Sequence, residues 1–212
     1  MIEVETGLIA AEVGRVALNL TSAKALLRDS AELVKLRVNT FLLATAWCGY
    51  FFAAQKTGHP GMRFGLFHAL FGIGMVSCGS AALNEVMERD IDKLMNRTAR
   101  RPIPAGRVRP LDAAVAGVLL ILFGTAYLVY FTNPLTGALT LLTAIIYLGA
   151  YTPLKRVAPI CTAIGAIPGA MPGVLGWAAC AGHLDWGRPC AICDPLLLAV
   201  SPLLFDSLAL SR

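Results

Sequence analysis

The sequence predicts an all-α protein that crosses a membrane several times as a polytopic transmembrane helical bundle. Three observations support this fold class. Of the 212 residues, 57% are hydrophobic and only 15% are charged, whereas soluble domains carry about 25% charged residues. Apolar stretches close to the length that spans a bilayer recur along the chain. Basic residues are concentrated in alternate connections between these stretches, which is typical of multi-pass membrane proteins.

Five apolar stretches approach the roughly 20 residues that a helix needs to cross a bilayer core of about 30 Å. A soluble all-α core with unusually apolar helices is the alternative, but five long runs with alternating loop charge argue against it. A sixth stretch, Pro195–Leu210, is short and contains Pro202 and Asp206, so it is a weaker candidate. The five clear stretches are Val38–Ala54, Phe64–Val86, Leu111–Phe131, Leu135–Tyr151 and Pro159–Ala181.

The number of Lys and Arg residues alternates between the connections. The segment before the first stretch has five, the following connections have two, seven, none and two, and the segment between the fifth and sixth stretches has one. Positive charge near spans favours the cytoplasmic side. We therefore predict that the N-terminus and the second and fourth connections are cytoplasmic. The net charge of +5 is then explained by topology, and we predict no nucleic-acid partner.

This organisation divides the chain into three parts. Residues 1–37 are predicted to form a cytoplasmic N-terminal lead-in, and residues 38–185 a transmembrane core. Residues 186–212 form a C-terminal tail of different character.

The second apolar stretch ends in a polar segment that contains Asn84, Glu88 and Asp92. At about 100° per residue these three side chains lie on one helical face within about 80°, whereas Asp90 lies on roughly the opposite side. One amide oxygen and two carboxylates suit Mg²⁺, which is usually held by one or two carboxylates together with substrate phosphates. Acidic groups at the edge of hydrocarbon are costly, which indicates a function.

A basic segment follows directly. It contains Lys93, Arg97 and Arg101, and the prolines Pro102 and Pro104 end the helix and predict an ordered turn. The guanidinium group of arginine matches the geometry of phosphate oxygens. Metal-binding acids followed by phosphate-binding arginines are the arrangement expected for a diphosphate substrate. The alternative is an ordinary solvated cytoplasmic loop, because basic loops are common in membrane proteins.

Several motifs together resemble the heme o synthase family of UbiA-type intramembrane prenyltransferases. The first is N-x-x-x-[D/E]-x-x-x-D, which runs into N-R-T-x-x-R-P-I-P-A-G and ends at Gly106. A shorter similarity joins Lys35–Val38 to the family's K-P-R-V, with Leu36 in place of proline. The resemblance covers roughly Glu32 to Asp185. The remaining stretches that are similar to family motifs are Tyr151–Arg156, Gly165–Pro172 and Gly176–Ala179.

The resemblance implies a fold of about nine spans in the cell inner (plasma) membrane, surrounded by the lipid bilayer. It implies transfer of a farnesyl group from farnesyl diphosphate to the vinyl group of heme b, which gives heme o. Asn84, Glu88 and Asp92 would be the catalytic residues and the ligands of the Mg²⁺ cofactor. An enzyme of heme a synthesis would be a partner protein. The residues expected to bind the diphosphate are Lys35, Lys93, Arg97, Arg101, Tyr151 and Lys155.

The sequence departs from the family pattern in two places. Glu88 stands where most members carry aspartate, and it retains the charge. After Asp185 no family motif is recognised, and Asp194 and Asp206 are too isolated to form the second acidic cluster that family members carry on a later loop. We therefore expect a chain that is truncated at its C-terminus. Two alternatives remain open: prenyl transfer to another aromatic acceptor such as a quinone precursor, and an inactive membrane fragment without the second acidic motif.

Overall fold

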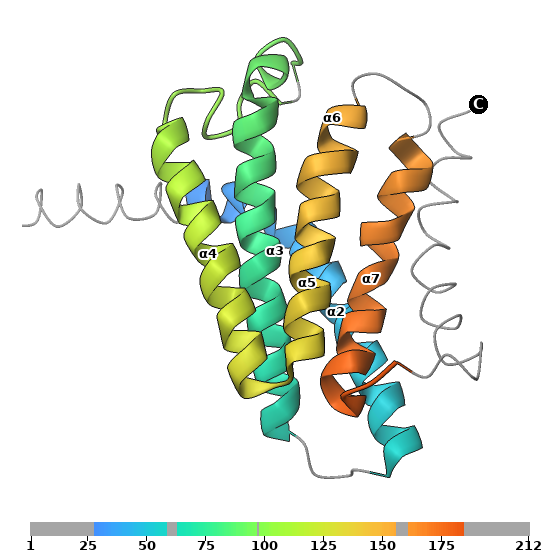
Figure 1. The fold of residues 1–212 in the computed structure, drawn as a ribbon. Helices are drawn as coiled ribbons and strands as arrows, with labels where there is room; N and C mark the ends of the chain where they lie inside the picture. The colour runs from blue at the N-terminus through green and yellow to red at the C-terminus, as the bar shows by residue number, and fades with distance from the viewer. Residues whose placement is uncertain (1–27, 59–62, 97, 156–160, 185–212) are drawn as a thin grey trace, which may run out of the picture.

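The apolar stretches form a bundle of helices (Figure 1). The computed structural model describes residues 28–58, 63–96, 98–155 and 161–184. Within these ranges the chain is helical apart from its connections and contains no β-strand, so the all-α class is confirmed. The helices are α2 (Leu36–Thr57), α3 (Arg63–Asp92), α4 (Pro110–Phe131), α5 (Pro134–Ile145), the π-helical segment η1 (Ile146–Tyr151), α6 (Thr152–Leu154) and α7 (Cys161–Ala181).

Three helical segments in the described ranges are long and apolar enough to cross a membrane. They are Phe64–Asp92, Pro110–Phe131 and Pro134–Leu154, the last of which joins α5, η1 and α6. Three of the five predicted spans are therefore confirmed by length and composition. Helices α2 and α7 lie over the first and fifth predicted stretches but are not among these three. The sixth stretch lies outside the described residues.

The arrangement of the helices gathers the polar motifs at one end of the bundle. Helix α3 packs most extensively against α4, and α2 packs against α7. The connection between α3 and α4 lies at the same end as α6, whereas the turn between α4 and α5 lies at the opposite end (Figure 1). The connection that follows α3 and the segment around α6 are far apart in sequence, but both lie at this end of the bundle (Figure 1).

Helices α2 and α7 approach each other closely through glycine residues. A Cβ atom at Gly176 would overlap the backbone oxygen of Ala46, and a Cβ atom at Gly49 would overlap the backbone oxygen of Gly173. Small residues at such crossings let helix backbones meet, which is a main source of helix association in lipid. The crossing fixes two walls of the cavity described below.

We predict that Gly176→Ala separates α2 from α7 and lowers the unfolding temperature of the purified protein in detergent. The added methyl group meets backbone atoms of Ala46, and overpacking of this kind costs about 1–3 kcal/mol. Gly74→Ala is the matched control, because a Cβ atom there would meet only the side chain of Leu43 at 3.6 Å. Equal unfolding temperatures for the two variants would contradict this view of the packing.

Candidate active site

The centre of the site is a buried polar ridge on α3, formed by Asn84, Glu88 and Asp92. These side chains lie on successive helical turns, and the residues are only 2%, 7% and 4% exposed. Asp90, which lies between the last two, is exposed, and its carboxylate is 3.6 Å from Arg89 Nε. This burial pattern matches the face predicted from the helical period.

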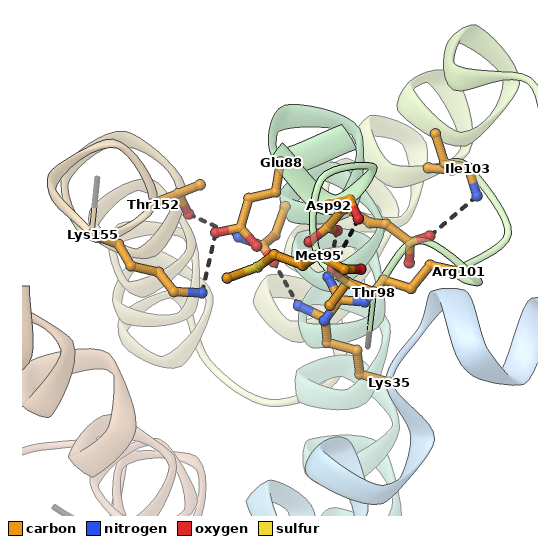
Figure 2. Close-up of polar contacts among 11 residues, drawn as sticks. Lys35, Glu88, Asp92, Met95, Thr98, Arg101, Ile103, Thr152 and Lys155 are labelled. Carbon is orange, nitrogen blue, oxygen red and sulfur yellow. Dashed lines mark hydrogen bonds and ion pairs between the residues drawn. The ribbon is translucent and has the colours of Figure 1, made fainter. Parts of the chain in front are cut away.

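Each residue of the ridge has a basic partner from a different part of the chain, and Figure 2 shows the three cations approaching α3. Isolated buried carboxylates cost several kcal/mol, and the cations offset part of the cost of burying Glu88 and Asp92. The three contacts are Lys35 Nζ to Asn84 Oδ1 at 2.5 Å, Lys155 Nζ to Glu88 Oε1 at 3.4 Å, and Arg101 Nη1 to Asp92 Oδ2 at 2.5 Å.

Lys35 reaches the ridge from an unusual backbone conformation. Its φ of 49° and ψ of 53° are left-handed, and it is the only non-glycine residue with a positive φ in the described ranges. Such a conformation costs roughly 1–2 kcal/mol. Burial lowers the pKa of Lys35, and the nearby Arg101 lowers it further. A bound anion would oppose both effects, because it favours the charged form of the amine.

The carboxamide of Asn84 is also held from the side opposite Lys35. Its Nδ2 donates a hydrogen bond to Thr152 Oγ1 at 3.2 Å, and Thr152 Oγ1 donates to the backbone oxygen of Tyr147 at 2.9 Å. Thr152 is completely buried. This chain of hydrogen bonds fixes the amide so that its oxygen faces Lys35.

A cavity of about 390 Å³ opens beside the ridge. Four predicted site residues line it, namely Lys35, Asn84, Tyr151 and Lys155. Tyr147 also lines the cavity and stacks on Tyr151, with ring centroids 5.6 Å apart. The volume lies within the range of about 300–1,000 Å³ that is typical of small-molecule pockets.

The cavity extends from the charged ridge into the apolar core. Ile73, which lines it, precedes Asn84 by 11 residues on α3, which is about 16 Å along a helix axis. Ile73 packs in the core with Leu175 of α7, and Leu175 also lines the cavity. An anionic head group at the ridge with an apolar chain below it is the ligand shape that this cavity suits.

A further buried acid, Glu85, anchors the connection between α3 and α4. It is completely buried, and its Oε1 accepts a hydrogen bond from the backbone nitrogen of Ile103 at 3.3 Å. At the start of the same connection, Thr98 Oγ1 donates to the backbone oxygen of Asp92 at 3.0 Å. These contacts hold the connection so that Arg101 faces Asp92.

Sequence reasoning missed Glu85, Thr152 and Tyr147. Of the predicted residues, Glu88, Asp92 and Arg101 lie at the ridge without lining the cavity, and Lys93 does not line it either. Lys93 is exposed and forms no ion pair with a described residue, and Arg97 lies outside the described residues. Glu85 could have been found from its position inside an apolar span, where an acid needs a partner. Thr152 lies in the Tyr151–Arg156 motif, but its hydrogen-bond partner, Asn84, lies on a different helix and could not be predicted from the local sequence.

The ridge offers oxygen ligands for a divalent cation. The described residues contain no group of three or more His, Cys, Asp or Glu side chains that could hold a metal ion. Glu88 and Asp92 supply two carboxylates and Asn84 an amide oxygen, and Mg²⁺ commonly takes one or two carboxylates while phosphate and water oxygens complete its shell. The donor set therefore fits a cation that is bound jointly by the protein and a diphosphate.

The fold and the site agree with a known family of membrane enzymes. The UbiA prenyltransferase family matches residues 42–210, and this chain belongs to that family. The match continues beyond Asp185, where the sequence motifs alone had shown no resemblance. The division into residues 1–37, 38–185 and 186–212 stays a prediction.

Within the family, the chain is similar to proteins named protoheme IX farnesyltransferase. It is 54% identical over 161 residues to that of Koribacter versatilis, which covers 76% of this chain and 52% of that protein. It is 40% identical over 196 residues to protoheme IX farnesyltransferase 1 of Pseudomonas fluorescens, which covers 90% of this chain and 62% of that protein. The chain thus spans between one half and two thirds of the length of these relatives.

A solved structure supports the fold. It is described as "Structural and mechanistic insights into the biosynthesis of Digeranylgeranylglyceryl phosphate synthase in membranes", and it matches with a TM-score of 0.66 over 82% of this chain and 59% of that chain. The sequence identity is 17%, so the likeness concerns the fold alone. Together with the apolar helices, the family assignment identifies a multi-pass membrane protein.

We predict that Glu85→Leu loosens the connection between α3 and α4. Leucine offers no acceptor to the Ile103 N–H, and an unsatisfied buried donor costs about 1–3 kcal/mol. Hydrogen exchange of the purified protein, measured by mass spectrometry, should rise in residues 98–108. Glu85→Gln retains a side-chain oxygen and should exchange nearly like the unmodified protein. Unchanged exchange in the leucine variant would show that Glu85 is not the anchor.

Proposed function

We propose that this chain transfers a farnesyl group from farnesyl diphosphate to the vinyl group of heme b, which gives heme o. The observation that carries the proposal is a single cavity in which Lys35, Asn84, Tyr151 and Lys155 lie above an apolar interior. The cations match the diphosphate, and the apolar wall matches the isoprenoid chain. The similarity to proteins named protoheme IX farnesyltransferase supports the choice of donor and acceptor.

We assign Asn84, Glu88 and Asp92 as the protein ligands of a divalent cation, and we infer Mg²⁺ from their oxygen donors. When bound, this cation neutralises charge on the diphosphate and makes it a better leaving group. Lys35, Arg101 and Lys155 already lie at the ridge. As the anion binds, they exchange part of their contact with the ridge for contact with phosphate oxygens, so that positive charge is in place where negative charge develops.

The chain's residues then guide a substitution at C1 of the farnesyl group. The bond between C1 and the diphosphate oxygen breaks, and its electron pair leaves with the diphosphate, to which Tyr151 donates a hydrogen bond. The terminal vinyl carbon of heme b forms a bond to C1. A water molecule adds to the cationic carbon next to the porphyrin ring and loses a proton, which leaves a hydroxyl group. The apolar wall keeps other water from the allylic cation.

We further infer the location and orientation of the protein. The alternation of basic residues between connections supports a cytoplasmic N-terminus, and the family supports a place in the inner (plasma) membrane. The ridge and the basic connection then face the cytoplasm. An enzyme of heme a synthesis is the partner expected to receive the product.

We predict that Asp92→Ala lowers farnesyl transfer by about a hundredfold or more, because losing a group that stabilises developing charge costs roughly 10²–10³ in rate. The assay uses membranes that contain the full chain, labelled farnesyl diphosphate and heme b. Removing Mg²⁺ should reduce the rate of the unmodified chain comparably. Asp90→Ala is the matched control, because Asp90 is exposed on the same helix and pairs with Arg89, and it should remain nearly fully active.

The same membranes distinguish between the acceptors. Farnesylated heme should form, and 4-hydroxybenzoate should give no product. Transfer to 4-hydroxybenzoate alone would contradict the acceptor assignment and leave the diphosphate site intact. No product with either acceptor, from a chain that is inserted normally, would contradict the proposed activity of this chain.

A further inference from the structure

An ion pair outside the cavity fastens the segment before α2 to the connection between α3 and α4. Arg107 Nε donates hydrogen bonds to both carboxylate oxygens of Asp29, at 2.9 and 3.0 Å. Its Nη2 donates to the backbone oxygen of Arg100 at 3.1 Å and lies 3.8 Å from Glu32 Oε2. The Asp29 side chain is only 15% exposed. One guanidinium group therefore joins two segments that are 78 residues apart in sequence.

The segment between this ion pair and the cavity is short and internally hydrogen-bonded. The backbone nitrogen of Val34 donates to the oxygen of Ser30 at 3.1 Å, and that of Lys35 donates to the oxygen of Glu32 at 3.0 Å. Asn39 Nδ2 donates to the backbone oxygen of Val34 at 2.7 Å, which fixes the junction with α2. Because these hydrogen bonds hold the segment together, a displacement of Asp29 should also displace Lys35.

Lys35 needs such a restraint for two physical reasons. Its left-handed backbone conformation is unfavourable for a residue with a Cβ atom and persists only when the surroundings impose it. Its ammonium group is also drawn out of water to reach Asn84, which costs free energy that an amide oxygen offsets only in part. When the restraint is removed, the residue should relax to an ordinary conformation, and Nζ should leave the ridge.

We propose that Asp29 and Arg107 form a positioning pair that holds Lys35 at Asn84, ready to receive the diphosphate of the substrate. This proposal rests on the proposed function of the cavity. Neither residue of the pair lines the cavity, so the pair acts on the substrate indirectly, through Lys35. Loss of the pair should therefore weaken substrate binding more than it slows the chemical step.

The test is a double-mutant cycle of Asp29→Asn and Arg107→Gln in the full chain, reconstituted in lipid nanodiscs. Arg109→Gln is the matched control, because it removes the same charge from the same connection and Arg109 makes no ion pair with a described residue. Each single variant should raise KM for farnesyl diphosphate about fivefold, with a smaller change in kcat. The double variant should match Arg107→Gln alone, because both substitutions remove the same ion pair. Arg109→Gln should leave KM nearly unchanged.

A second readout is independent of turnover. Hydrogen exchange of residues 28–35 should become faster in both single variants and in the double variant, but not in Arg109→Gln. Inorganic diphosphate with Mg²⁺ should also bind more weakly to the same three variants. If the unmodified chain shows no turnover, the proposed function fails, while exchange and diphosphate binding still decide the role of the pair.

Three results would overturn the positioning role. Arg107→Gln and Arg109→Gln could behave alike in exchange and in diphosphate affinity. The effects of the two single variants could add in the double variant, which would show that they act separately. Faster exchange with unchanged diphosphate affinity would show that the ion pair between Asp29 and Arg107 only stabilises the fold.

Discussion

Ionised carboxylates inside an apolar helical bundle need cationic partners, because an unpaired charge there costs several kcal/mol. Helix α3 buries Glu88 and Asp92 at one end of the bundle. Their partners, Lys155 and Arg101, come from the segment after α6 and from the connection between α3 and α4. Lys35, from before α2, meets the neighbouring amide of Asn84. Two ion pairs and one hydrogen bond from a cation therefore bring three separate segments together on one helix.

Close helix packing provides the apolar half of the site. Helix α2 can cross α7 at backbone contact because Gly49 and Gly176 have no Cβ atom. On the other side of the cavity, the ring of Tyr151 occupies the space that a side chain at position 165 would need, since a Cβ atom on Gly165 would lie 2.6 Å from the ring. The result is an apolar cavity with charged side chains at one end, which is the combination that an isoprenoid diphosphate requires.

Sequence reasoning predicted what depends on one helix and missed what depends on contacts between helices. The helical period grouped Asn84, Glu88 and Asp92 and separated Asp90, because this grouping is a property of α3 alone. The apolar stretch was predicted to end at Val86, but the helical face was followed on to Asp92, and α3 does continue to Asp92.

The same limit explains the residues that were missed. Thr152 and Asn84 are 68 residues apart in sequence, and Glu85 bonds to a backbone group of the following connection, so no local pattern links them. The left-handed conformation of Lys35 has no local signal either, because glycine or asparagine normally marks such a position. The motif resemblance placed Lys35 and Lys155 in the site without indicating their partners.

The central claim is that cations from separate segments converge on the ridge of α3 to receive a diphosphate. Calorimetric titration of the protein in nanodiscs with inorganic diphosphate and Mg²⁺ tests it most directly. Lys155→Gln should weaken binding about tenfold, because a charge-assisted hydrogen bond contributes about 1.5–3 kcal/mol. Lys56→Gln is the control, because Lys56 lies over the ring of Trp177 and does not line the cavity, and it should bind like the unmodified chain. Equal affinity for the two variants would contradict the claim.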